Sequence, residues 1–142
     1  MSFDLKITNG DLSIGSDGDI SVVIGNQKIF QEIKKIVLTD VGENKFHPYY
    51  GSRAGSLSVG SIVDYDFISS ELKRSVSESI TNLIRLKDSQ SRYQNLNPSE
   101  VILTLDSVDV ERDGVDPRVW SIYISVTTQS LDDVNTVINI RM

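Results

Sequence analysis

The chain has 142 residues, of which 39% are hydrophobic and 24% charged, a composition typical of one globular domain rather than a disordered segment. Its net charge of −6 argues against binding to nucleic acid, because affinity for phosphate comes largely from lysine and arginine. The absence of cysteine excludes disulfides and thiolate chemistry, and with a single histidine we expect neither a metal centre nor another cofactor.

The N-terminal segment predicts a β-hairpin. Apolar and polar residues alternate over residues 3–8, and the Asn9-Gly10 pair that follows favours a type I′ turn. A third short strand is expected at residues 20–24. The same stretch lacks the basic start and apolar core of a signal peptide, and no apolar run in the chain could span a bilayer. We therefore expect a chain that stays in the cytoplasm where it is made and does not enter the membrane.

Two helices are predicted from apolar residues spaced three or four apart. The first covers residues 27–40, with Asn26 as its N-cap and Gly42 as its stop. The second begins at Tyr65 and repeats the pattern to Ile84, with charged residues and serines on its other side. The polar segment 89–99, which contains Pro98, is expected to be a connection.

Alternating apolar residues predict longer strands at 101–110, 119–128 and 134–142. The order of three short strands, two helices and three strands predicts an α+β fold in a single domain, residues 1–142. One mostly antiparallel sheet would carry both helices on one face. The C-terminal strand would be an exposed edge, and such edges accept a strand from another chain.

The segment GENKFHPYYGS, residues 42–52, gathers an acid, the only histidine and two tyrosines between the predicted helices. Glu43 could act as one carboxylate of a muramidase-type glycoside hydrolase, with Asp40, Asp64 or Asp66 as the other. Its flanking residues are charged or amide groups that would keep it solvated. We therefore favour a loop-orienting or interface role for Glu43 and expect no catalytic residue.

Without catalysis, the same segment is predicted to be a rigid corner between the helices. Pro48 would stiffen it and Gly51 would allow a turn. The aromatic residues Phe46, Tyr49 and Tyr50 would then anchor the corner to the core or to a neighbouring subunit.

The stretch NGDLSIGSDGDISVVIGNQKIFQEIKKIVLTDVGE and the corner residues resemble a known family: the baseplate wedge proteins of contractile-tailed phages, also called the protein 25 or "lysozyme-like" wedge family and shared with type VI secretion baseplates. Shared features are a Gly-Asp-Ile strand leading into a glutamine-containing helix that ends at Gly-Glu, and a corner with a proline and an aromatic-Gly-Ser sequence. A long helix and closing strands follow. Two family features are absent: an arginine after Gly-Glu, and a Glu-Pro-Arg tripeptide before the next strand.

The resemblance implies a structural subunit of the virion tail baseplate, assembled in the host cytoplasm. The implied partners are other wedge proteins and tail sheath subunits, with the tail tube as a further candidate; an adaptor outside any phage particle is the other non-enzymatic alternative. Strands 119–128 and 134–142 would pair with sheath subunits, and deleting residues 134–142 should leave a foldable domain that cannot prime sheath assembly. The candidate interface residues are Glu43, Phe46, Pro48, Tyr50, Gly51, Arg85, Arg92, Val134, Ile138 and Ile140.

Overall fold

The main sheet consists of three antiparallel strands in the order β5-β6-β7. Their bounds in this computed structural model, which describes residues 3–54 and 65–141, are Ile102–Arg112 for β5, Val119–Thr128 for β6 and Asp133–Arg141 for β7. Strand β6 is central and pairs with both neighbours. The prediction that residues 119–128 offer an edge to a partner is therefore wrong, because both edges of β6 are taken.

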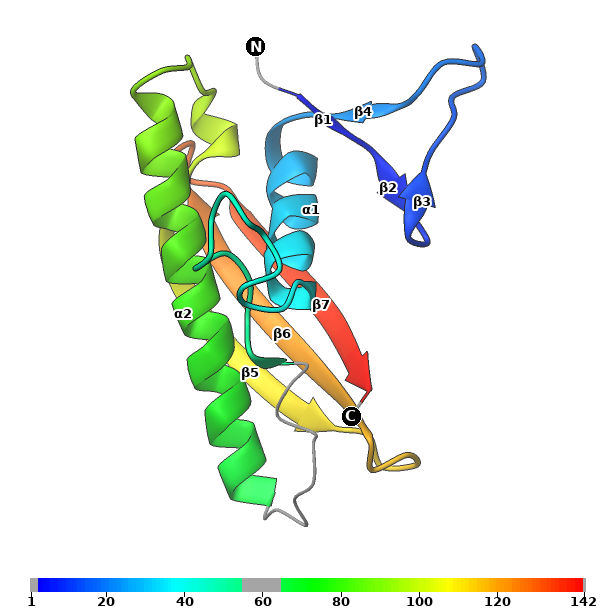
Figure 1. Ribbon diagram of the computed structural model, residues 1–142, viewed down its shortest axis with the longest axis vertical. Helices are drawn as coiled ribbons and strands as arrows, with labels where there is room; N and C mark the ends of the chain where they lie inside the picture. Colours follow the sequence, from blue (N-terminus) through cyan, green and yellow to red (C-terminus); the bar gives the residue numbers. More distant parts are fainter. Residues whose placement is uncertain (1–2, 55–64, 142) are drawn as a thin grey trace.

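Two helices cover one face of this sheet, α1 at Gly25–Leu38 and α2 at Tyr65–Ser91 (Figure 1). Apolar residues three or four apart line one side of each helix and are fully buried, as are the inward residues of β6. The buried set includes Ile29, Ile33, Ile36, Leu72, Val76, Ile80, Trp120, Ile122 and Val126. Burial of each aliphatic side chain contributes about 1.5–3 kcal/mol to folding. The predicted α+β class, with both helices on one face, is confirmed.

Both helices differ from the prediction at their ends. Helix α1 begins at Gly25, so Asn26 is not its N-cap; the Asn26 amide instead donates to Asp132, with 3.4 Å between Nδ2 and Oδ2. It ends at Leu38, before Gly42. Helix α2 continues to Ser91 and so extends into the predicted connection at residues 89–99. Pro98 does not prevent this, because a proline restricts the backbone of only the residue before it. The short 3-10 helix η2, Pro98–Glu100, completes the connection to β5.

The N-terminal arm, residues 3–24, lies outside the main sheet. It holds four two-residue strands: β1 at Asp4–Leu5, β2 at Ile7–Thr8, β3 at Asp11–Leu12 and β4 at Val22–Val23. Strands β2 and β3 form the predicted hairpin, with positive φ angles at Asn9 and Gly10, while β1 pairs with β4. The prediction of one sheet is therefore wrong for these strands, and Figure 1 shows the arm on the α1 side of the molecule, away from α2.

Candidate functional site

The corner after α1 is closed by backbone hydrogen bonds between its two ends. The Ser52 N–H donates to Thr39 O over 2.8 Å, and the Ser52 hydroxyl donates to Val37 O over 2.5 Å. Gly51 has a φ of +119°, and a Cβ there would lie 2.5 Å from Thr39 O. Only glycine fits this position, because a side chain would overlap the backbone at the end of α1.

The aromatic residues of the corner divide between core and solvent. Tyr50 packs against the core, and burial, together with nearby carboxylates, raises the pKa of its hydroxyl. Phe46 is 92% exposed and Pro48 is also exposed, so both are accessible to a partner. The Tyr49 hydroxyl lies 3.3 Å from His47 Nδ1 with the two rings edge to face, which orders this exposed part of the corner.

The position of Glu43 does not favour glycosidase chemistry. Its side chain is exposed in a turn in which its N–H donates to Asp40 O over 3.2 Å. A general acid of a glycosidase is usually held in an apolar cleft opposite a second carboxylate. Of the suggested partners, Asp66 is exposed in the first turn of α2 and Asp64 lies outside the described residues.

The other candidate interface residues lie on two separate elements. Arg85 is exposed on α2, and Arg92, just past its end, is an exposed residue 3.6 Å from Asp88 in an ion pair. Val134, Ile138 and Ile140 lie on β7 with their side chains in the core, at 7%, 3% and 8% exposure. The side chains of these three residues are therefore not accessible to a partner.

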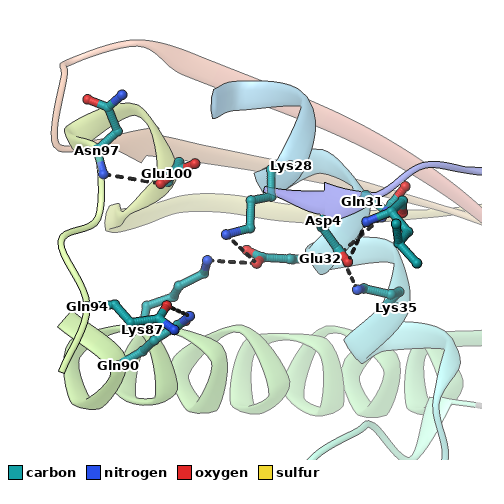
Figure 2. Close-up of polar contacts among 11 residues, drawn as sticks. Asp4, Lys28, Gln31, Glu32, Lys35, Lys87, Gln90, Gln94, Asn97 and Glu100 are labelled. Atoms are coloured by element: carbon teal, nitrogen blue, oxygen red, sulfur yellow. Dashed lines mark hydrogen bonds and ion pairs between the residues drawn. The ribbon is translucent and has the colours of Figure 1, made fainter. Parts of the chain in front are cut away.

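A buried charged cluster joins the two helices and was missed by the sequence reasoning. Lys28 and Glu32 come from α1 and Lys87 from α2, and Figure 2 shows both ammonium groups directed at the Glu32 carboxylate. Nζ of Lys28 and Nζ of Lys87 lie 3.9 Å and 2.7 Å from Glu32 Oε1. One feature of the sequence does indicate a buried charge here: Lys87 continues the apolar stripe of α2 that runs through Ile80 and Leu83.

Burial is the largest influence on the pKa values of Glu32 and Lys87. Desolvation raises the pKa of Glu32 in spite of the opposing charges of Lys87, Lys28 and Lys35. It also lowers the pKa of Lys87, although Glu32 acts in the opposite direction. Because each shift disfavours the charged form, the pair carries a desolvation cost that its attraction only partly offsets.

A second polar cluster fixes the N-terminal arm to α1. The Lys35 ammonium and the Gln31 amide both donate to Asp4 Oδ2, and Gln31 also bonds the backbone of Leu5 and Ile7 at 2.7 Å and 2.9 Å. Burial alone would raise the pKa of Asp4, but its bond and attraction to Lys35 outweigh burial and lower it. The arm is therefore held on α1 by polar contacts.

The hydrogen-bond pattern shows which backbone groups of β7 have no backbone partner among residues 3–54 and 65–141. The Thr128 N–H donates to Asp132 O over 2.9 Å, which makes these two residues a hydrogen-bonded pair in register with β6 and β7. Hydrogen-bonded pairs alternate along an antiparallel ladder, so the even-numbered residues of β7 face β6. The odd-numbered residues direct their N–H and C=O groups away from the sheet: Asp133, Asn135, Val137, Asn139 and Arg141.

The same alternation identifies the opposite edge of the sheet. The Asp113 N–H donates to Val119 O over 2.9 Å, in register with the pairing of β5 and β6. Odd-numbered residues of β5 beyond its bulges therefore face β6, while Val108 and Val110 point to the other edge. As far as the described residues show, the sheet thus has two edges, one on β5 and one on β7.

Comparisons with known proteins relate this chain to others by fold. No family model matches it, and no curated protein sequence matches it. Among the solved structures that match is one from Geobacter sulfurreducens described as a "putative tail lysozyme", with a TM-score of 0.60 and 18% identity. The match covers 82% of this chain and 89% of that chain. The two chains therefore share a fold over most of their lengths.

No helix within residues 3–54 and 65–141 is long and apolar enough to cross a membrane.

Proposed function

We propose that this chain is a structural subunit of the baseplate wedge of a contractile tail, and that it acts in the virion after assembly in the host cytoplasm. Its partners would be other wedge proteins, the first tail sheath subunits and the tail tube. The observation that supports this proposal most strongly is the edge position of β7, on a fold shared with a structure described as a "putative tail lysozyme". A sheath segment would add to this edge through backbone hydrogen bonds.

The anchoring of β7 supports this role. Strand β7 pairs with β6 from Asp133 to Arg141, and its inward side chains are buried under α1. The strand is therefore held in one register by its pairing and its buried side chains, while its outer backbone groups stay available. A preformed template of this kind lowers the ordering cost of binding, because only the incoming segment must become ordered.

The corner and α2 would supply contacts to the other wedge proteins. Phe46 and Pro48 are exposed apolar residues suited to a protein interface, and Glu43, Arg85 and Arg92 are exposed charges that can pair at its rim. We propose no catalytic role for Glu43, since its exposed turn lacks the apolar surroundings of a general acid.

A proline at Val137 tests the proposed edge. This residue is 47% exposed, and its N–H points away from β6, so the substitution should change the free energy of unfolding by about 1 kcal/mol or less. It removes the central outward donor of the edge. Sheath assembly on purified baseplates can be observed by electron microscopy. We expect baseplates that carry Val137→Pro to prime sheath assembly no better than background.

The control is Val110→Pro, which removes an outward donor from the opposite edge on β5; unlike Val137, Val110 also packs against the core, so its free energy of unfolding is measured alongside. Sheath assembly should persist with this variant. Assembly that survives Val137→Pro and is lost with Val110→Pro would contradict the assignment of the β7 edge.

A further inference from the structure

A groove of about 530 Å³ lies beside the first residues of the free edge. It is bounded by three elements: Lys6, Ile7 and Val23 of the N-terminal arm; Asn26, Phe30 and Lys34 among the α1 residues; and Asp133, Val134 and Asn135 of β7. Asp133 and Asn135 are two of the residues whose backbone groups point away from the sheet. A strand added to β7 would therefore run into this groove, which we call the edge groove.

The α1 wall of the edge groove combines an apolar ring with a positive charge. Asn26, Phe30 and Lys34 are spaced four apart and so lie along one face of the helix. Phe30 is 37% exposed, and Lys34 Nζ lies 4.4 Å from the centre of its ring. Lys6 lies across the groove on the arm. Within the described part of the chain, neither Lys6 nor Lys34 forms an ion pair with an acid.

The geometry of an added strand determines which of its residues meet this wall. Side chains alternate between the two faces of a sheet, so every second residue of the incoming strand would face α1. Phe30 and Lys34 are about 6 Å apart along the helix axis, which matches roughly two residues of an extended chain. Two inward side chains at positions i and i+2 would then meet the ring and the ammonium group.

We propose that the edge groove recognises an extended segment of a partner protein that carries an apolar and an acidic residue two positions apart, both facing α1. This inference rests on the proposed strand addition at β7 and names its recognition chemistry. The apolar side chain packs on Phe30, Ile7 and Val23. The carboxylate pairs with Lys34, assisted by Lys6, and lies away from Asp133 at the other end of the groove. Whether the acid precedes or follows the apolar residue depends on the direction of the strand.

Two matched peptides test the proposal on the full chain. Both peptides alternate valine and threonine over about ten residues. The central valine is replaced by aspartate in one peptide and by lysine in the other. A valine then lies two positions away on each side of the charge, so the test works for either direction of the bound strand. Titration is followed by NMR shifts of the Asn135 and Val137 amides. We expect the aspartate peptide to bind at least tenfold more tightly, and Lys34→Glu to reverse that preference. Lys73→Glu, an exposed charge on α2, should leave it unchanged.

Each other outcome overturns the inference. Equal shifts of the β7 amides with both peptides would leave strand addition intact but remove the recognition chemistry. A preference that Lys34→Glu does not alter would place the selectivity elsewhere. If neither peptide binds, the edge groove is not a recognition site, while the proposed wedge function is still decided by the sheath assay with Val137→Pro.

Discussion

Replacing Glu32 with glutamine should lower the free energy of unfolding by about 3–5 kcal/mol, because it removes the carboxylate with which the buried Lys87 ammonium group is paired. The side chains of Lys28 and Lys87 are 5% and 3% exposed, so neither can regain water without disturbing the contact between α1 and α2. This loss of stability should become smaller as the pH rises towards 10.5. Burial lowers the pKa of Lys87, so the folded variant releases the Lys87 proton at a lower pH than the unfolded variant does. Urea unfolding across this pH range measures the effect.

The matched control for Glu32→Gln is Lys87→Met, which removes one cation and leaves Glu32 paired with Lys28. Methionine is a flexible apolar side chain of similar length, and Glu32 keeps the charge of Lys28 at 3.9 Å, so we expect a smaller loss than for Glu32→Gln. Equal losses in the two variants would show that the cluster does not depend on the carboxylate in the way described.

Deleting residues 134–142 should abolish cooperative folding, contrary to the expectation from sequence that a foldable domain would remain. The deletion removes Val134, Ile138 and Ile140 from the core, and each buried aliphatic side chain contributes about 1.5–3 kcal/mol. It also leaves the inner edge of β6 without a partner. Together these losses are comparable with the whole stability of a domain, about 5–15 kcal/mol.

Near-UV circular dichroism and thermal melting of the truncated chain measure this outcome. Asn135→Ala, a change on the outward face of the same strand, should melt within a few degrees of the unchanged protein. A cooperative transition in the truncated chain would show that β7 is dispensable and would contradict its place in the core.

Local patterns of the sequence predict the elements well, because they depend on neighbours in the chain. The Asn9-Gly10 turn, the apolar stripes of both helices and the alternation in the last three strands all appear where expected. Helix ends were less predictable. Gly25 is the first residue of α1, and the cap position belongs to Ile24, a residue whose side chain offers no capping oxygen.

The arrangement of strands could not be read from these patterns. Every strand of an antiparallel sheet alternates in the same way, whether it is central or at an edge, so residues 119–128 gave no sign that both their edges are occupied. The N-terminal strands also alternate, yet each is two residues long and pairs only within the arm. Strand order depends on contacts between distant segments, which periodicity does not encode.

In the candidate site, too, features within one segment of the chain were predictable and contacts between distant segments were not. The corner residues were found because they are concentrated in one segment, and the requirement for glycine at Gly51 follows from its closeness to Thr39. The pairing of Glu32 with Lys87 escaped notice because the two residues are far apart in the chain. A lysine in an apolar helical stripe is the feature of the sequence that points to such a buried partner.

Hydrogen exchange at the β7 amides tests the central claim most directly. In the free protein, the amides of Asn135, Val137 and Asn139 should exchange rapidly, while those of Thr136 and Ile138, which face β6, should be protected. After assembly with the sheath, the three outward amides should become protected as well. Unchanged exchange at these amides in the assembled tail would contradict the account that β7 is the template for sheath attachment.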